Sequence, residues 1–334
     1  MKFGPVATAQ AKGAVLAHSV ALGARRRLRK GRMLDADDIA ALAEAGIQEV
    51  IVARLVAGDV IEDEAARRLA AALVPDPDGQ HLEVTKPFTG RVNLLAGAAG
   101  VVVLDVAALE AVNRVHPMIT LATVPPYQQM AARGMVATIK IISYAVPAAA
   151  LEAACALARS AIRLAPPVVD QVRLIITDIP GGAGTKGQAA IADRVAAFGL
   201  ELAPPTVVAH QAAALADALR KDARGLTLIL TGSATSDIDD VAPAAVREAG
   251  GTVERFGMPV DPGNLLFLGQ LDAQPVIGLP GCARSPALNG ADWVLARVMC
   301  GIAVSDEDIA GMGVGGLLKE IPTRPQPRAG KSAR

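Results

Sequence analysis

The sequence is poor in aromatic residues. Phe, Trp and Tyr together make up 2% of its 334 residues, although 52% of the residues are hydrophobic. The core must therefore consist of alanine, valine, leucine and isoleucine, and such small side chains favour helices packed closely on sheets. At roughly 100–200 residues per domain, the length allows two or three modest domains.

Cysteine is rare as well. The three cysteines, Cys155, Cys282 and Cys300, share no CxxC spacing and form no even set. This pattern speaks against a disulfide framework and against a cysteine zinc site, and it is typical of a reducing compartment. We therefore expect a cytoplasmic protein.

Two further features are missing. The 33 basic residues balance the 33 acidic residues, so the chain lacks the positive excess of a nucleic-acid binder. No apolar run reaches about 18 residues without a charge or a proline, and the first residues contain no long apolar stretch with a cleavage site. We expect neither a nucleic-acid partner nor a membrane partner.

The chain begins with an α+β segment, which we place at residues 1–80. Asp35 has the position of an N-cap before the run IAALAEAG, and Gly46 ends this helix. The run EVIVARL predicts a strand, and DVIEDEAARRLAAALV predicts a second helix. Residues 81–165 follow as a β-rich segment that closes with an alanine-rich helix linking two domains.

The next segment, residues 166–305, alternates strands and helices. Its strands VRLIIT, LAPPTVVA, LTLILTG and TVERFGM are separated by helical runs such as QAAALADALRKDA. This alternation predicts an α/β domain with a mostly parallel sheet and helices on both faces. Residues 306–334 form a C-terminal extension whose end, RPQPRAGKSAR, is expected to be disordered.

A glycine-rich turn, TDIPGGAGTKG, follows the first strand of this α/β segment. Ligands bind beyond the carboxyl ends of the strands in such sheets. The backbone N–H groups of Gly181, Gly182 and Gly184 would therefore cradle a phosphate, close to Lys186. The turn matches neither G-x-G-x-x-G nor the P-loop pattern, and a tight turn without a ligand is the alternative interpretation.

The stretch LTGSATSDIDDV combines small, hydroxyl and carboxylate residues after a later strand. Hydroxyls donate to a phosphate or a heterocycle, and carboxylates accept from ring N–H groups or hold a divalent cation. Helix capping by Asp239 or Asp240 is the alternative, but it explains only one of the three aspartates. The predicted ligand residues here are Thr231, Gly232, Ser233, Thr235, Ser236, Asp239 and Asp240.

Four motifs together resemble the molybdopterin-binding domain shared by molybdopterin molybdenumtransferase, molybdopterin adenylyltransferase and gephyrin. They are TGSATSDIDD, VAPAAVREAGG, DPGN and GLPGCARS, in the family's order and spacing over residues 170–302. The run LRKGRMLDADDIAALAEAGIQEVIV is more loosely similar to the opening domain of the molybdenumtransferase. The resemblance implies molybdopterin or its nucleotidylated form as ligand, a role in molybdenum cofactor biosynthesis, and a homo-oligomer, typically a dimer.

The resemblance also implies the roles of individual residues. Asp240 takes the position of the family's pterin-site aspartate, where it would accept from the pterin or hold Mg²⁺, and Asp178 and Lys186 complete the catalytic set. Further ligand residues follow from the two later turns of the pattern: Pro262, Gly263, Asn264, Pro280, Gly281, Cys282, Arg284 and Ser285.

Departures from the family pattern bear on catalysis. The strand-end motif keeps one carboxylate, Asp178, but shifts it by one place and lacks the glutamate, and Asn264 replaces the lysine of P-G-K-P. Lys186 or Arg284 would have to supply the missing positive charge. Three functions stay open: a molybdenumtransferase-like enzyme, a non-catalytic carrier or insertion chaperone that meets a molybdoenzyme or a cofactor-modifying enzyme, and a small-molecule sensor or scaffold.

Overall fold

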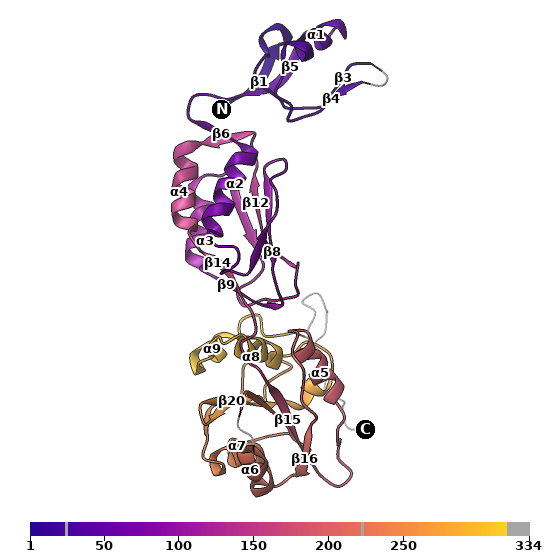
Figure 1. The fold of residues 1–334 in the computed structure, drawn as a ribbon, viewed down its shortest axis with the longest axis vertical. Helices are drawn as coiled ribbons and strands as arrows, with labels where there is room; N and C mark the ends of the chain where they lie inside the picture. The colour runs from indigo at the N-terminus through magenta and orange to yellow at the C-terminus, as the bar shows by residue number, and fades with distance from the viewer. Residues whose placement is uncertain (24–25, 222–223, 319–334) are drawn as a thin grey trace, which may run out of the picture. The chain divides into compact units, whose positions relative to one another are not determined.

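The computed structural model describes residues 1–23, 26–221 and 224–318. These residues form two compact units, one of Met1–Ala98 with Val102–Leu164, the other of Ala99–Val101 with the chain from Ala165 onward (Figure 1). The tail RPQPRAGKSAR, for which disorder is predicted, lies outside the described residues. The four-part division expected from the sequence stays a prediction.

The first unit begins with a small antiparallel sheet, strand order β1-β5-β2, and helix α1. Asp35 caps α1 as predicted, because its carboxylate accepts the amide N–H of Asp38 while Asp38 accepts that of Asp35. Leu42, Val50 and Val52 form part of the core beneath the helix. The elements are β1 (Lys2–Ala7), η1 (Thr8–Gln10), β2 (Val15–Leu16), β3 (Val20–Ala21), β4 (Arg27–Leu28), α1 (Ala36–Glu44) and β5 (Glu49–Arg54).

The rest of the first unit packs helices α2, α3 and α4 with an antiparallel sheet of order β10-β12-β8-β7 around one core. The helix expected to link two domains, α4, instead packs against α2 and α3 and buries Leu151, Ala154 and Ala158 in this core. The elements are β6 (Asp59–Ile61), α2 (Glu62–Leu73), β7 (Leu82–Val84), β8 (Arg91–Ala96), β9 (Gly100–Leu104), α3 (Val106–Val115), β10 (Ile119–Thr123), β11 (Gln129–Met130), β12 (Met135–Ile141), β13 (Ala145–Pro147), α4 (Ala148–Ala158) and β14 (Ile162–Ala165).

The second unit is built on a six-stranded sheet of order β16-β15-β17-β20-β19-β18. The first four strands run parallel, and β19 and β18 add antiparallel pairings at one edge. This confirms the predicted α/β segment with a mostly parallel sheet. The strands are β15 (Val172–Asp178), β16 (Thr206–Ala209), β17 (Leu226–Leu230), β18 (Thr252–Phe256), β19 (Phe267–Leu271) and β20 (Gln274–Leu279), and the helices are α5 (Gln188–Ala196), α6 (Ala212–Lys221), α7 (Val241–Glu248), η2 (Gly281–Arg284), α8 (Gly290–Met299) and α9 (Asp306–Gly311).

Both faces of this sheet are buried. All five residues of β17 are buried, as expected for a central parallel strand covered on both sides. Alternate residues such as Ile175 and Ile229 lie in the core beneath α6 and α7. Leu174 and Leu228, on the opposite face, are fully buried as well, and α8 packs against β20.

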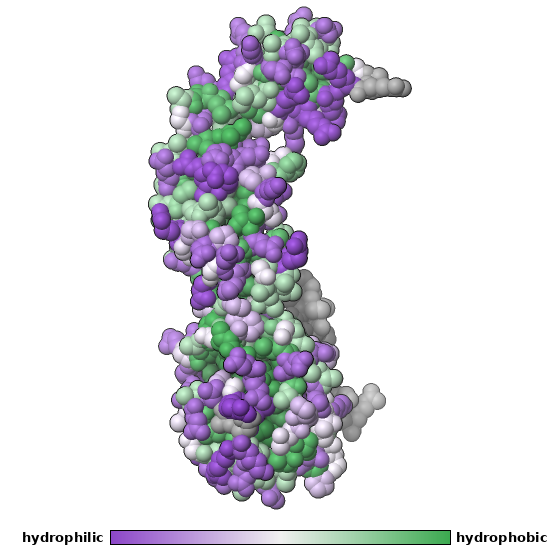
Figure 2. All heavy atoms as spheres, viewed as in Figure 1, coloured by the Kyte–Doolittle hydropathy of each residue, from purple (hydrophilic) through white to green (hydrophobic). Residues whose placement is uncertain are grey.

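The surface mixes polar and apolar residues. Figure 2 shows hydrophilic and hydrophobic residues interspersed over the visible face of each unit, consistent with a chain in which alanine and valine are abundant and charges are balanced. Among the described residues, no helix combines the length and the apolar character that crossing a membrane requires.

A close approach between two strands generates the first prediction. A Cβ at Gly278 in β20 would lie 1.9 Å from the ring of Phe267, the fully buried residue paired with it on β19. Gly278→Ala should lower the free energy of unfolding by about 3 kcal/mol, because the buried ring has to move in a closely packed core. Urea unfolding measures this, with Gly281→Ala as control, since a Cβ at Gly281 meets nothing within 4 Å. Equal stabilities of the two variants would contradict the packing described.

Candidate functional site

The candidate site lies where four parallel strands end at the same edge of the second unit. Residues at the carboxyl ends of neighbouring strands are in register: Asp178 of β15 pairs with Ala209 of β16, and Leu230 of β17 pairs with Leu279 of β20. The loops after these strands contain most of the ligand residues predicted from the sequence. We call this edge and its loops, residues 179–187, 210–211, 231–240 and 280–289, the carboxyl rim.

Arg284 ties three of these loops together. Its Nη2 donates to the carbonyl oxygen of Thr231 at 2.8 Å, and its Nη1 donates to the carbonyl oxygens of Gly184, at 3.4 Å, and Lys186. Gly187 permits this approach, because a Cβ there would lie 2.7 Å from the Cα of Arg284. The three predicted ligand loops therefore meet, as the sequence interpretation requires.

Arg194 of α5 fixes the loop that follows Arg284. Its guanidinium donates to the carbonyl oxygens of Ala283, Ser285 and Ala287 at 2.8–3.1 Å. It also forms an ion pair with Asp292 in the first turn of α8, and both side chains of the pair are largely buried. The sequence interpretation did not include Arg194, because nothing in a helix sequence shows which distant carbonyl groups its face will meet.

A second group missed from the sequence is His210, directly after β16. Its Nδ1 lies 2.8 Å from the hydroxyl oxygen of Thr177, and its Nε2 lies 2.9 Å from that of Ser233. The amide of Gly232 donates to the same Thr177 hydroxyl at 3.0 Å. The position of His210 directly after a predicted strand could have indicated it. The histidines are scattered along the sequence, however, so no partner for His210 could be predicted.

The carboxylates of the loop 231–240 have local partners. Asp240 caps α7 and accepts the amides of Val241 at 2.7 Å and Ser236 at 2.9 Å. Asp237 accepts the amide of Asp239, whose own carboxylate pairs with Arg247 at 2.7 Å. Local hydrogen bonding thus gives each of the three aspartates a structural role, and ligand binding by them stays a prediction.

Two hydroxyls of the same loop are also engaged. The Thr231 hydroxyl donates to the carbonyl oxygen of Ser233 at 2.6 Å, and the buried Thr235 hydroxyl lies 3.3 Å from that of Thr231. Ser236 makes a long contact of 3.3 Å to the carbonyl oxygen of Ala234. Ser233 differs from these residues, because its hydroxyl contacts only the ring of His210 among the described residues.

The DPGN turn reaches a different part of the rim. The amide of Gly290, at the start of α8, donates to the carbonyl oxygen of Pro262 at 2.8 Å, and Gly263 packs against Gly290. The side-chain amide of Asn264 donates to the carbonyl oxygen of Met258 at 3.3 Å. The turn therefore contacts the end of the loop that follows Arg284, and its ligand role stays a prediction.

Residues 179–297, which span all the loops that meet at Arg284, match the family model of a probable molybdopterin binding domain. This segment is a domain of that family. The match confirms the resemblance inferred from the sequence, and it supports a role in molybdenum cofactor biosynthesis. Residues 5–54 match a second family model, a domain of unknown function (DUF8806).

Similar solved structures are distant. One is the crystal structure of the molybdopterin biosynthesis MoeA protein from Pyrococcus horikosii, 12% identical, with a TM-score of 0.31, covering 90% of this chain and 75% of that chain. Another is a molybdenum cofactor biosynthesis protein from Pyrococcus furiosus, 12% identical, with a TM-score of 0.25, covering 93% of this chain and 65% of that chain. No curated protein matches the chain. Molybdopterin as ligand therefore rests on the family match.

The carboxyl rim of the molybdopterin-binding domain is open to solvent. Gly181, Gly182, Ser233 and Gly281 are exposed, and so are the side chains of the predicted catalytic residues Asp178 and Lys186. Other predicted ligand residues are exposed or half-buried: Gly184, Gly232, Ser236, Cys282 and Ser285. Pro280 is buried behind them. Burial lowers the pKa of Arg284, and the nearby negative charge of Asp178 opposes this.

A resident metal does not fit the donors of the domain well. Within residues 1–23, 26–221 and 224–318, no three His, Cys, Asp or Glu side chains gather as a metal site would require. Asp240, the predicted Mg²⁺ ligand, already accepts two backbone amides. The described donors around Asp240 therefore do not fit a resident Mg²⁺ ion.

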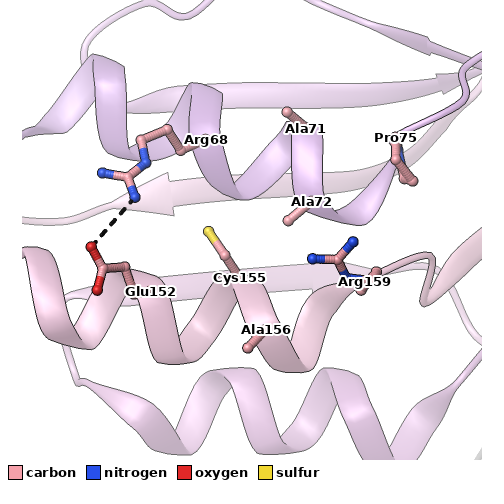
Figure 3. A pocket seen from close by; sticks show the side chains of 8 residues that line it. All are labelled: Arg68, Ala71, Ala72, Pro75, Glu152, Cys155, Ala156 and Arg159. Carbon is pink, nitrogen blue, oxygen red and sulfur yellow. Dashed lines mark ion pairs between the residues drawn. The ribbon is translucent and has the colours of Figure 1, made fainter.

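Several hollows among the described residues lie away from the rim. One of about 1080 Å³ lies at the amino ends of the same strands, lined by Asp170, Gln274 and neighbouring residues. Another of about 380 Å³ lies between α2 and α4 of the first unit (Figure 3). There Arg68 faces Glu152 at 3.9 Å, beside Cys155, whose pKa is raised by burial. We place the site at the carboxyl rim because ligands bind at that edge of parallel sheets.

Cys300, the buried cysteine of the second unit, is unsuited to act as a nucleophile. Burial raises the pKa of Cys300 to about 12, so almost all of it stays a thiol near neutral pH, and the thiol is a poor nucleophile. Cys282 is half-buried and belongs to the carboxyl rim itself, in the turn η2 that contains Arg284.

The bonds of Arg284 generate the second prediction. Arg284→Lys keeps the charge but cannot donate to carbonyl groups of two loops from one planar group. We expect faster amide hydrogen exchange in residues 179–187 and 231–240, and a loss of about 2 kcal/mol of stability. Hydrogen-exchange mass spectrometry measures the first effect and urea unfolding the second. The control is Arg114→Lys, whose parent side chain is exposed and pairs with Glu110 within α3. Unchanged exchange in both loops would show that Arg284 does not hold them.

Proposed function

We propose that the chain binds molybdopterin, or its nucleotidylated form, at the carboxyl rim and acts in molybdenum cofactor biosynthesis as a molybdenumtransferase-like protein. The observation that supports this proposal is the meeting of three loops at Arg284, within a segment that matches a probable molybdopterin binding domain. These loops come from separate strands, and their exposed backbone and hydroxyl donors face one edge of the sheet.

Neutral donors would hold the terminal phosphate of the ligand. The amides of Gly181 and Gly184 have no hydrogen-bond partner among the described residues, whereas the amide of Gly182 is used within the turn by the carbonyl oxygen of Ile179 at 2.8 Å. Both free amides belong to residues in the left-handed region, with φ of +73° and +51°. Oriented amides and a hydroxyl stabilise an anion without a full opposing charge.

Lys186 is the cation best placed to assist. Its side chain is exposed and has no ion-pair partner among the described residues. Arg284, the other replacement considered for the missing lysine, already donates to three carbonyl groups. In a transferase, Lys186 would neutralise charge on the phosphate that leaves with the nucleotide, because phosphoryl chemistry depends on positioning and charge stabilisation.

A carrier is the second candidate function, and Asn264 favours it. This residue replaces the family's lysine, and its amide group is turned to the carbonyl oxygen of Met258. A protein with this turn would keep the ligand loops without a cation from that side. It would bind the pterin and transfer it to a molybdoenzyme without turnover.

The third prediction tests binding and turnover. The chain should bind molybdopterin, and a transferase should release AMP from adenylylated molybdopterin when molybdate and Mg²⁺ are supplied. Lys186→Ala should slow AMP release by about tenfold or more, because one charge contact to the phosphate is lost. Lys221→Ala, in the last turn of α6 before the amino end of β17, is the control and should leave release unchanged. Tight binding without AMP release would support the carrier, and absence of binding would contradict both functions.

The fourth prediction separates the charge of Asp240 from its capping role. Asp240→Asn keeps an oxygen that accepts the amide of Val241, but its NH₂ group cannot accept the amide of Ser236. Asp240→Asn should therefore lose about 1 kcal/mol of stability through the bond from Ser236, whereas Asp240→Ala, which loses both bonds, should lose about 2 kcal/mol. If Asp240 contacts the pterin, the asparagine variant should bind molybdopterin several-fold more weakly at a temperature at which its thermal unfolding curve shows it to be folded. Unchanged affinity would leave Asp240 with the structural role alone.

A further inference from the structure

The burial of Thr177 indicates which groups donate and which accept in the two hydrogen bonds that join Thr177, His210 and Ser233. Thr177, near the end of β15, is fully buried. Its hydroxyl oxygen accepts the amide of Gly232 at 3.0 Å and lies 2.8 Å from Nδ1 of His210. A hydroxyl has one hydrogen to donate, and leaving a buried donor without an acceptor is costly. Among the described residues, Nδ1 of His210 is the acceptor within reach.

This assignment fixes the tautomer of His210. Since Thr177 donates to Nδ1, Nδ1 has no hydrogen, and in the neutral ring the hydrogen is on Nε2. Nε2 then donates to the Ser233 hydroxyl oxygen, which lies 2.9 Å away. The Ser233 hydroxyl accepts from His210 and keeps its own hydrogen for another acceptor.

The opposite tautomer would give Ser233 the opposite role. Ser233 would donate to Nε2, as a nucleophile does to its base, and would present lone pairs to the rim. The buried Thr177 hydroxyl would then lose its acceptor, so the hydrogen-bond geometry disfavours this arrangement. Ser233 is also exposed, and its carbonyl oxygen is held by the Thr231 hydroxyl at 2.6 Å, so its position is fixed from both sides.

We propose that Thr177 and His210 form a relay that sets Ser233 as a hydrogen-bond donor to an anionic oxygen, in the first place a phosphate monoester oxygen of a ligand at the carboxyl rim. This inference rests on the proposed function, because that function supplies the phosphate. His210 is a positioning residue here, since it acts through Ser233. The relay adds one oriented donor to the free amides of Gly181 and Gly184.

The first test reads the tautomer without any ligand. The chain has four histidines, so ¹⁵N NMR of the histidine-labelled full chain gives few signals, and His210→Gln identifies those of His210. We expect the neutral ring of His210 to show a protonated Nε2 and an unprotonated Nδ1. Thr177→Ser should keep this pattern, and Thr177→Val should shift it toward a mixture of tautomers. A neutral ring with its hydrogen on Nδ1 overturns the relay, and the wild-type spectrum decides this even if the valine variant does not fold.

The second test measures the donor role with molybdopterin as the probe. Ser233→Ala should weaken binding by about tenfold, as expected for loss of a hydrogen bond to a charged group. Ser233→Thr, which keeps the hydroxyl, should recover most of the affinity. His210→Gln should weaken binding less than Ser233→Ala, because the serine hydroxyl remains.

The two proposals fail in different ways. If the wild type binds molybdopterin and Ser233→Ala binds equally well, the relay is wrong and the proposed function stands. If the wild type does not bind molybdopterin, the proposed function is wrong, and titration with inorganic phosphate decides the relay. A phosphate-dependent shift of the His210 Nε2 signal that Ser233→Ala abolishes then supports the donor role, and no such shift overturns it.

Discussion

The carboxyl rim depends on one guanidinium group. Loops that leave separate parallel strands have exposed carbonyl groups and no sequence proximity to hold them in one arrangement. Arg284 supplies fixed, planar donors to the carbonyl oxygens of Thr231, Gly184 and Lys186, and backbone acceptors of this kind need partners when partly buried. In the same way, Arg194 donates to carbonyl oxygens of the following loop and forms an ion pair with Asp292 of α8. Both arginines therefore hold loop shape, and neither has a full set of donors left for a ligand.

The sheet and the place of the site were predictable from the sequence. The run LTLIL is apolar at most positions, because β17 is buried on both faces, and Asp35 stands at the start of α1 because a helix end needs an acceptor for its amides. Both features depend on neighbours in the sequence. Parallel strands end at one edge, so the loops 179–187 and 231–240 could be expected to lie close together.

The partners of the individual polar groups were not predictable. Asp240 lies next to α7 in the sequence, and its cap could be foreseen, but the bond between His210 and Ser233 joins loops of two different strands. The packing of the alanine-rich helix α4 was not predictable for another reason. Most of its residues are alanine and Glu152 is its single charged residue, so no continuous polar face marks the solvent side, and its packing against α2 and α3 could not be predicted from the pattern.

The partners of the charged side chains at and near the rim decide which donors remain for an anion. Arg284, Arg194 and Arg247 each pair with backbone carbonyl groups or a carboxylate, while Asp178 is exposed and close enough to Arg284 for its charge to act on it. Lys186, unlike these three arginines, has no such partner among the described residues. In the proposed binding mode, an anion at this rim would meet mainly amides and a hydroxyl, and the strength of such hydrogen bonds depends on their distance and angle. If the rim binds a phosphate as proposed, it would do so only while its loops keep their positions, so the bonds that Arg284 makes to the loop carbonyl groups would control how well the rim binds it.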